Sequence, residues 1–230
     1  MNKKLLKTTI IIGFYGFIAT CAVHGKNLDT SSWEVVYHES FSEVKAGELP
    51  EDFFVLDGHF EVIEKKGNKC LKLNGKPVGE HGFLYGPRLS TDSFEVAFSC
   101  LGAVKSRRHS VFAGSLGGIK GYIFRINPVS EKLSFYYDGA RISDVSLPVW
   151  SSNDWMNVLL RITCDSKRSK REILISMKND YEQYEIKAEL LIQDEIKNGR
   201  FALWGFAYAE QDIYWDNLVI RVPNLYEGIK

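Results

Sequence analysis

Residues 155–164 read WMNVLLRITC, and this stretch decides the fold class. Its apolar members occupy every second position, namely Met156, Val158, Leu160 and Ile162. The residues between them include the polar Asn157, Arg161 and Thr163. Because successive side chains of a β-strand point to opposite faces of the sheet, this alternation predicts a strand with one face buried and the other in water.

Similar short runs, rich in Val, Ile, Phe, Tyr and Trp, continue along the chain from Trp33 onward. They comprise residues 33–41, 53–56, 59–64, 70–73, 94–101, 110–114, 122–126, 133–137, 155–164, 172–178, 184–191, 201–206 and 213–222. No long segment between them has the 3.6-residue apolar period of an amphipathic helix. We therefore predict an all-β fold, a two-sheet antiparallel β-sandwich that forms a single domain.

Turn-forming dipeptides separate many of these runs. They are Asp57-Gly58, Lys66-Gly67, Asn74-Gly75, Asp138-Gly139 and Asn198-Gly199. Asn-Gly and Asp-Gly supply the positive φ angles of tight hairpin turns. All six prolines lie at the ends of runs or between them, as expected of a residue that cannot donate a hydrogen bond to a sheet. Together these signals predict hairpins between consecutive strands.

The composition is that of a globular protein with little excess charge. Hydrophobic residues make up 45% and charged residues 25%, and Lys+Arg and Asp+Glu number 29 each. Loss of Lys3, Lys4 and Lys7 with a cleaved leader would reduce the 29 basic side chains to 26. A slightly acidic body argues against a nucleic-acid partner, because phosphate binding needs a surplus of cations.

The N-terminus has the layout of an export signal. A basic segment, residues 1–7, precedes an uncharged apolar run over residues 8–20. At about 13 residues this run is shorter than the ~20 that a membrane-spanning helix needs. We therefore predict a leader over residues 1–25, a domain over 33–222 and a C-terminal tail over 223–230, with the body exported to the periplasm, the outer membrane or the medium.

Two routes of processing stay open. The segment Ile18-Ala19-Thr20-Cys21 resembles a bacterial lipobox, in which Cys21 would be acylated and become the new N-terminus. Ordinary cleavage after Ala22 or Gly25 is the alternative. A lipid anchor at Cys21 would be the protein's only contact with a membrane.

The remaining cysteines and the histidines do not predict a metal site. Cys70, Cys100 and Cys164 lie in or at the ends of apolar runs, so we interpret them as buried side chains that form at most one disulfide. Their spacing fits no zinc pattern. The five histidines form no H-x-H or H-E-x-x-H motif.

Several segments together suggest a family. Residues 39–41 followed by 53–62, the strand start at 155–158, and the close at 199–205 followed by 214–220 resemble the conserved blocks of bacterial concanavalin A-like, laminin-G-like jelly-roll domains. The resemblance covers most of residues 33–222 and implies a concanavalin A-like jelly roll. Such motifs are more specific for a fold than for an activity.

Relatives of this kind include glycan-binding modules, family 16 glycoside hydrolases and 3-keto-disaccharide hydrolase-like domains. The E-x-D-x-x-E motif of family 16 is absent, and the nearest acidic pair, Glu61 and Glu64, falls on opposite faces of a strand. Residues 121–125 match the G-i-f-x-R strand of the keto-disaccharide branch, but a basic loop over 166–171 replaces its N-G hairpin.

The resemblance therefore implies a non-catalytic carbohydrate-binding or envelope-associated domain whose partner is a glycan or polysaccharide. One alternative is a glycoside hydrolase-like enzyme whose carboxylates, such as Glu80, Asp138 or Asp144, meet only in three dimensions. A second alternative is a structural protein of the cell envelope.

Three residues are predicted to contact a glycan: Arg125, Tyr136 and Trp204. Alternation places Arg125 and Tyr136 opposite the apolar faces of their strands, and aromatic rings can stack on the C–H face of a sugar. No cofactor is required for such binding.

The resemblance also implies a structural calcium ion. In many relatives an acidic residue from the first strand and one from the last strand hold Ca²⁺, and the matching residues here are Glu39 and Asp216. The alternative is that Asp216 and Asn217 end a hairpin or hydrogen-bond to neighbouring backbone.

Overall fold

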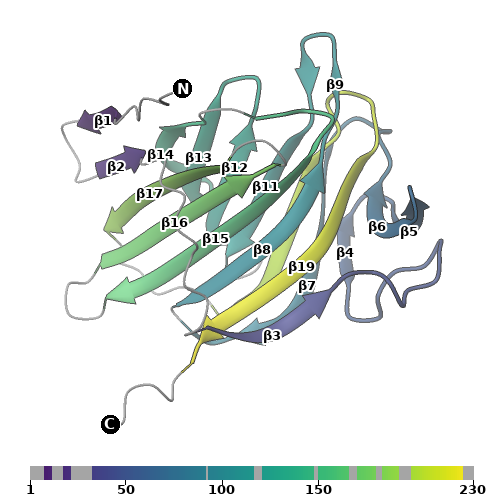
Figure 1. Cartoon of the computed structure of the whole chain (residues 1–230), viewed down its shortest axis with the longest axis horizontal. Helices are drawn as coiled ribbons and strands as arrows, with labels where there is room; N and C mark the ends of the chain where they lie inside the picture. Colours follow the sequence, from purple (N-terminus) through teal and green to yellow (C-terminus); the bar gives the residue numbers. More distant parts are fainter. Residues whose placement is uncertain are drawn as a thin grey trace, which may run out of the picture.

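The computed structural model describes residues 8–11, 18–21, 33–91, 93–116, 121–147, 150–165, 170–179, 183–191 and 198–224. Within these ranges every regular element is a β-strand. No helix in the described part of the chain is long and apolar enough to cross a membrane. Two large sheets pack face to face (Figure 1), which confirms the predicted all-β sandwich.

Among the described residues the larger sheet has ten strands, all paired antiparallel. Their order is β1 (Thr8–Ile11), β2 (Ile18–Cys21), β17 (Gln183–Leu191), β16 (Lys170–Lys178), β15 (Trp155–Asp165), β8 (Phe94–Leu101), β19 (Ile213–Pro223), β6 (Asn68–Leu73) and β5 (Phe60–Lys65). The tenth strand, β3 (Trp33–Glu39), pairs with β19 beyond this path. The first strand after residue 32 therefore lies beside the last strand of the chain (Figure 1).

In the part of the chain that the structure describes, the smaller sheet has seven strands. Their order is β14 (Ala140–Ser146), β13 (Lys132–Tyr137), β12 (Tyr122–Asn127), β11 (Val111–Leu116), β18 (Gly199–Phe206), β7 (Glu80–Leu89) and β4 (Phe54–Asp57). A separate hairpin consists of β9 (Val104–Lys105) and β10 (Arg108–His109). Lys105 and Arg108 of this hairpin both pair with Glu210, which fixes it to the loop before β19.

The apolar faces of both sheets meet in one core. Met156, Val158, Leu160 and Ile162 are all buried there, as the alternation of residues 155–164 predicted. Trp215 contacts Phe83 and Phe112 edge to face, with ring centroids 5.8 and 5.9 Å apart. Burial of each large apolar side chain contributes about 1.5–3 kcal/mol, so this interlayer core is the main source of stability.

Side chains on the outer faces of both sheets are more buried than predicted. On the larger sheet Glu95 is fully buried and accepts hydrogen bonds from Arg161, at 2.8 and 2.6 Å, and from Arg221. On the smaller sheet Val111, Ala113 and Phe206 form a second buried cluster. The expectation of a fully wet outer face was wrong because long side chains from adjacent strands lie across the middle of each sheet and cover it.

Two of the five predicted turns have the backbone expected of a tight hairpin, and one of the others is not a hairpin turn. Both residues of Lys66-Gly67 and of Asp138-Gly139 have positive φ, as two-residue hairpin turns require. Asn74-Gly75 is not a hairpin turn. Gly75 packs against the backbone of Gln211 and donates its N–H to Asp212, so a glycine is needed there for close approach.

The predicted leader and tail lie largely outside the described residues, which omit 1–7, 12–17, 22–32 and 225–230. The two described pieces of the leader are β1 and β2, and β2 pairs with β17 through Cys21, Thr20 and Ala19. Cleavage of the leader and acylation of Cys21 remain predictions.

Candidate functional site

The outer face of the smaller sheet carries all three predicted glycan residues. Trp204 of β18 lies opposite Ala113 of β11, and Ala113 lies opposite Arg125 of β12. Directly opposed residues of antiparallel strands share one face. Arg125 and Trp204 therefore belong to one row across the sheet, and Tyr136 approaches Arg125 from β13.

The guanidinium of Arg125 lies over aromatic rings. Its central carbon is 4.3 Å from the ring centroid of Phe206 and 5.7 Å from that of Tyr136, which is cation–π geometry. Nη2 donates a hydrogen bond to Glu80 Oε1 at 3.5 Å, which is at the outer limit for such a bond. Among the described residues its buried Nε has no partner, so this cation retains hydrogen-bonding capacity.

Trp204 lies flat against the sheet. A Cβ added to Gly82, directly opposite on β7, would stand 2.3 Å from Cε3 of the indole, so only glycine permits this packing. The buried Nε1 of Trp204 also lacks a partner within the described part of the chain. Unpaired buried donors are uncommon in proteins, and this row contains two of them.

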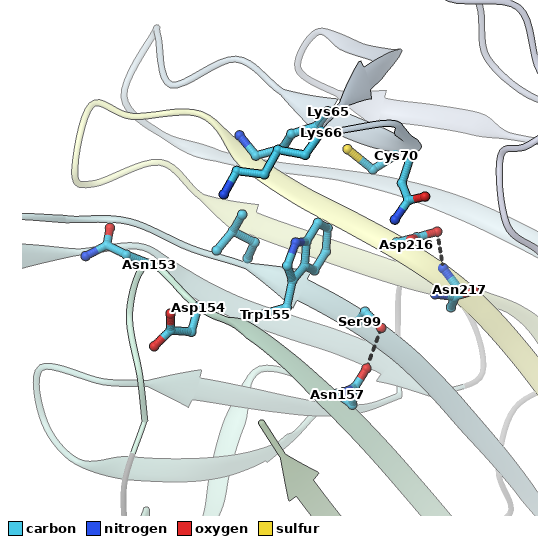
Figure 2. A pocket seen from close by; sticks show the side chains of 12 residues that line it. Lys65, Lys66, Cys70, Ser99, Asn153, Asp154, Trp155, Asn157, Asp216 and Asn217 are labelled. Carbon is cyan, nitrogen blue, oxygen red and sulfur yellow. Dashed lines mark hydrogen bonds between the residues drawn. The ribbon is translucent and has the colours of Figure 1, made fainter. Parts of the chain in front are cut away.

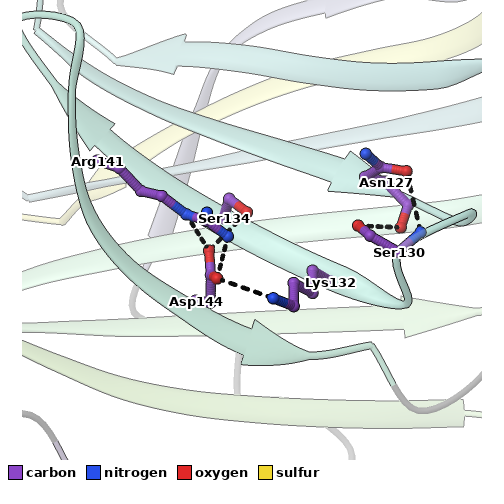
Figure 3. Close-up of polar contacts among 6 residues, drawn as sticks. All are labelled: Asn127, Ser130, Lys132, Ser134, Arg141 and Asp144. Carbon is purple, nitrogen blue, oxygen red and sulfur yellow. Dashed lines mark hydrogen bonds and ion pairs between the residues drawn. The ribbon is translucent and has the colours of Figure 1, made fainter.

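A polar network borders this surface on β13 and β14 (Figure 3). Asp144 accepts hydrogen bonds from Ser134 Oγ at 2.7 Å and from Arg141 Nε at 2.6 Å, and Lys132 approaches to 3.5 Å. Partial burial opposes ionisation, but the hydrogen bonds from Arg141 and Ser134 outweigh it and hold the pKa of Asp144 below its ordinary value. Asp144 is thus an ionised acceptor that braces the edge of the sheet.

Sequence reasoning missed two neighbours of the predicted residues, Phe206 and Tyr208. Phe206 supports Arg125, while Tyr208 donates to Glu80 Oε1 at 3.3 Å. Trp204, Phe206 and Tyr208 follow one another at every second position. That spacing, read as one strand face, was the signal that could have grouped them.

No family model matches the chain, and no curated protein matches it. Solved structures do. The CBM2 module of the evolved Dit of Lactobacillus casei BL23 phage J-1 aligns with a TM-score of 0.57 and 11% identity, covering 84% of this chain and 97% of that one. A Bacillus subtilis protein with a galectin-like fold aligns with a TM-score of 0.56 and 7% identity, covering 82% of this chain and 97% of that one. The exoplasmic/lumenal domain of VIP36, in its Ca²⁺/Man3GlcNAc-bound form, aligns with a TM-score of 0.53 and 8% identity, covering 80% of this chain and 87% of that one.

The fold is a concanavalin A-like jelly roll. At identities this low the similarity concerns the fold alone, and it confirms the architecture that the sequence blocks implied. The relations to particular branches of this fold that the sequence suggested remain predictions.

Two carboxylates of the hydrolase alternative, Glu80 and Asp144, lie far apart in this jelly roll. Glu80 lies on β7 and Asp144 on β14, five strand positions away, which is about 24 Å along the sheet at ~4.8 Å per strand. Asp138 lies in the turn between β13 and β14. Paired glycosidase carboxylates are separated by only ~5–9.5 Å, so Glu80 and Asp144 do not form such a pair.

Glu39 and Asp216, the predicted calcium residues, lie at the junction of β3 and β19. Asp216 Oδ1 accepts the backbone N–H of Asn217 at 2.7 Å, and Glu39 Oε1 accepts that of Phe41. Burial raises the pKa of Asp216, and the charge of Glu39 adds to the shift. The described residues contain no group of three or more His, Cys, Asp or Glu side chains suited to a metal. Backbone carbonyls and water would have to supply most of the ligands, and calcium remains a prediction.

The three body cysteines are free thiols. Cys70 and Cys100 are buried, as interpreted from the sequence, whereas Cys164 is partly exposed. Burial raises the pKa of Cys70 to about 11 and that of Cys100 well above its usual range. These two thiols are protonated at neutral pH and are poor nucleophiles.

Proposed function

We propose that this protein is an exported domain that binds glycans without cleaving them, through the surface around Arg125, Tyr136 and Trp204. One observation carries the proposal. An indole flattened against Gly82 and a guanidinium held over two aromatic rings lie in the same row of the sheet. A sugar presents C–H faces that pack on aromatic rings and hydroxyl groups that accept hydrogen bonds from a guanidinium.

The structural neighbours support this ligand class. The structure of VIP36 contains Man3GlcNAc and Ca²⁺, and the phage module carries the name CBM2. The slightly acidic body offers no support for nucleic acid as a partner. Export, with a lipid anchor at Cys21 or simple cleavage, rests on the basic and apolar layout of residues 1–20.

The separation of Glu80 from Asp144 supports binding without hydrolysis. Asp144 is occupied by Arg141, Ser134 and Lys132, and Glu80 by Arg125 and Tyr208. The pKa of Asp144 is held below its ordinary value by Arg141 and Ser134, whereas a general acid beside an anionic nucleophile in a glycosidase needs a raised pKa. A structural ion of Ca²⁺ held by Glu39 and Asp216 is part of the proposal.

A glycan array probed with the purified protein tests the function. We expect retention of a defined set of glycans, about tenfold weaker binding by Trp204→Ala and by Arg125→Ala, and no release of sugar. Val129→Ala, which trims an exposed side chain in the turn between β12 and β13, is the matched control. Binding of no glycan would favour the structural alternative, and release of sugar would favour the enzyme.

A further inference from the structure

We propose that the outer face of the larger sheet carries a second binding site, specific for neutral oligosaccharides and centred on Trp155. The site is a pocket of about 450 Å³ (Figure 2), within the ~300–1,000 Å³ typical of small-molecule sites. It lies on the other sheet from Trp204 and shares no residue with that surface.

The strand register assembles this pocket. Asn157 of β15 lies opposite Ser99 of β8, which lies opposite Asp216 of β19. Trp155 lies opposite Leu101 in the next row of the same face. The residues that alternate with them, Met156, Cys100 and Trp215, are buried in the core. The row and Trp155 must therefore point away from the core, as Figure 2 shows.

A β-bulge shapes the floor of the pocket. The pairing of β19 with β8 shifts register between Asp216 and Val219, and Asn217 has a φ of 51°. Bulges re-aim side chains and are frequent next to functional sites. A non-glycine residue with positive φ is itself uncommon and found disproportionately at such sites. Here the bulge brings both Asp216 and Asn217 to the pocket wall.

The polar groups of the row are oriented for a ligand. Ser99 Oγ donates to Asn157 Oδ1 at 2.6 Å, so the amide oxygen is engaged and the NH₂ group of Asn157 remains a donor. Asp216 uses Oδ1 to accept the N–H of Asn217, and its other oxygen has no partner among the described residues. A fixed donor beside a free acceptor matches a sugar hydroxyl group, which both accepts and donates.

Charge and aromatic character narrow the ligand class. The lining contains two lysines and two aspartates, Lys65, Lys66, Asp154 and Asp216, so it is balanced and offers a polyanion no excess of cations. Trp155 is half-buried, and it makes no ring contact or hydrogen bond with the described residues. Its indole is thus available to stack on a neutral sugar ring.

Two adjoining hollows extend the pocket into a trough. One, of about 400 Å³, shares Lys65, Lys66, Leu101 and Asn153 with it and continues to Asp212. The other, of about 460 Å³, shares Asn68, Asp216 and Asn217 and continues to Ser40. A trough with its aromatic ring in the middle fits a linear oligosaccharide better than a monosaccharide.

Calorimetric titration of the Trp204→Ala protein with neutral oligosaccharides of one to six sugars tests this site separately from the proposed one. We expect binding to persist, to tighten with chain length, and to weaken about tenfold or more in Trp204→Ala/Trp155→Ala and Trp204→Ala/Asn157→Ala. Thr163→Ala, an exposed position on the same face of β15, should change nothing.

Three outcomes would overturn the second site: no binding by Trp204→Ala, unchanged affinity in the Asn157→Ala variant, or a preference for acidic over neutral glycans. Because Asn157 is exposed, the Asn157→Ala variant should fold, and its affinity for the oligosaccharide tests the second site even where Trp155→Ala fails to fold. The surface around Trp204 has a separate criterion, because it fails when Trp204→Ala alone leaves binding by the whole protein unchanged.

Discussion

Gly82 and Trp204 are a steric pair: the indole of Trp204 occupies the space into which a side chain at Gly82 would project. Gly82→Ala should therefore displace the ring and destabilise the protein by about 1–3 kcal/mol. In a Trp204→Ala background the same change should have little effect. Urea unfolding of the four proteins forms a double-mutant cycle, and additive losses would show that the two residues are not coupled.

The buried Glu95 should be a strong determinant of stability. It is fully buried between Arg161 and Arg221, and loss of one member of such a cluster costs about 3–5 kcal/mol because it leaves uncompensated charge. We expect a loss near this size for Glu95→Gln in urea unfolding. Glu34→Gln, on exposed β3, is the control. Equal midpoints for the two variants would contradict this role for Glu95.

Asp216 should destabilise the metal-free protein at neutral pH. Burial raises its pKa in the folded state, Glu39 adds to the shift, and Asn217 and His38 oppose it. A carboxyl group whose pKa is raised in the folded state destabilises the folded protein when the group is ionised. This destabilisation is present at pH values above the raised pKa and decreases as the pH falls through it. Asp216→Asn should raise the melting temperature at pH 7 with chelator present, and the gain should shrink toward pH 4. A lower melting temperature at pH 7 would show the opposite sign.

If Glu39 and Asp216 hold Ca²⁺, the ion should reverse the destabilisation caused by ionised Asp216. A ligand that binds only the folded state stabilises it in proportion to RT ln(1 + [L]/Kd). The melting temperature of the wild-type protein should rise with free Ca²⁺, whereas Asp216→Asn and Glu39→Gln should not respond. A wild-type melting temperature that is indifferent to both Ca²⁺ and chelator would exclude the site.

The thiols should react in an order set by burial. Cys164 is partly exposed, whereas Cys70 and Cys100 are buried with raised pKa values. We expect maleimide to label Cys164 in the native protein and to reach Cys70 and Cys100 only after unfolding. Mass spectrometry of the peptides gives the order, and early labelling of Cys100 would contradict the packing.

The sequence allowed strands to be predicted wherever one face was continuously apolar. Residues 94–101 coincide with β8, and the alternation at 155–164 placed Asn157 and Arg161 on the outer face as found. β7 was missed because Gly82, Gly86 and Pro87 interrupt its pattern. Side chains from distant parts of the sequence pack against these two glycines. Gly82 lies under Trp204, and Gly86, with a φ of 65°, packs against Ile220 and Tyr37. Such long-range contacts cannot be predicted from the local sequence pattern.

The candidate sites were predictable only in part for the same reason. Arg125 and Tyr136 lie on adjacent strands, so strand alternation was enough to place them together. The trough around Trp155 combines residues from β6, β8, β15 and β19, which lie far apart in the sequence. Only the strand order brings them together, and that order is a property of the tertiary fold.

The side-by-side arrangement of β3 and β19 has a mechanical consequence. Trp33 pairs with Pro223, so the first residue of β3 and the last residue of β19 lie at the same end of one antiparallel ladder. A load applied between these two ends would break the hydrogen bonds one after another instead of shearing them all together. Tension between residues 33 and 223 would therefore peel β3 away at low force. The junction that holds Glu39 and Asp216 lies at the far end of that ladder and would open last.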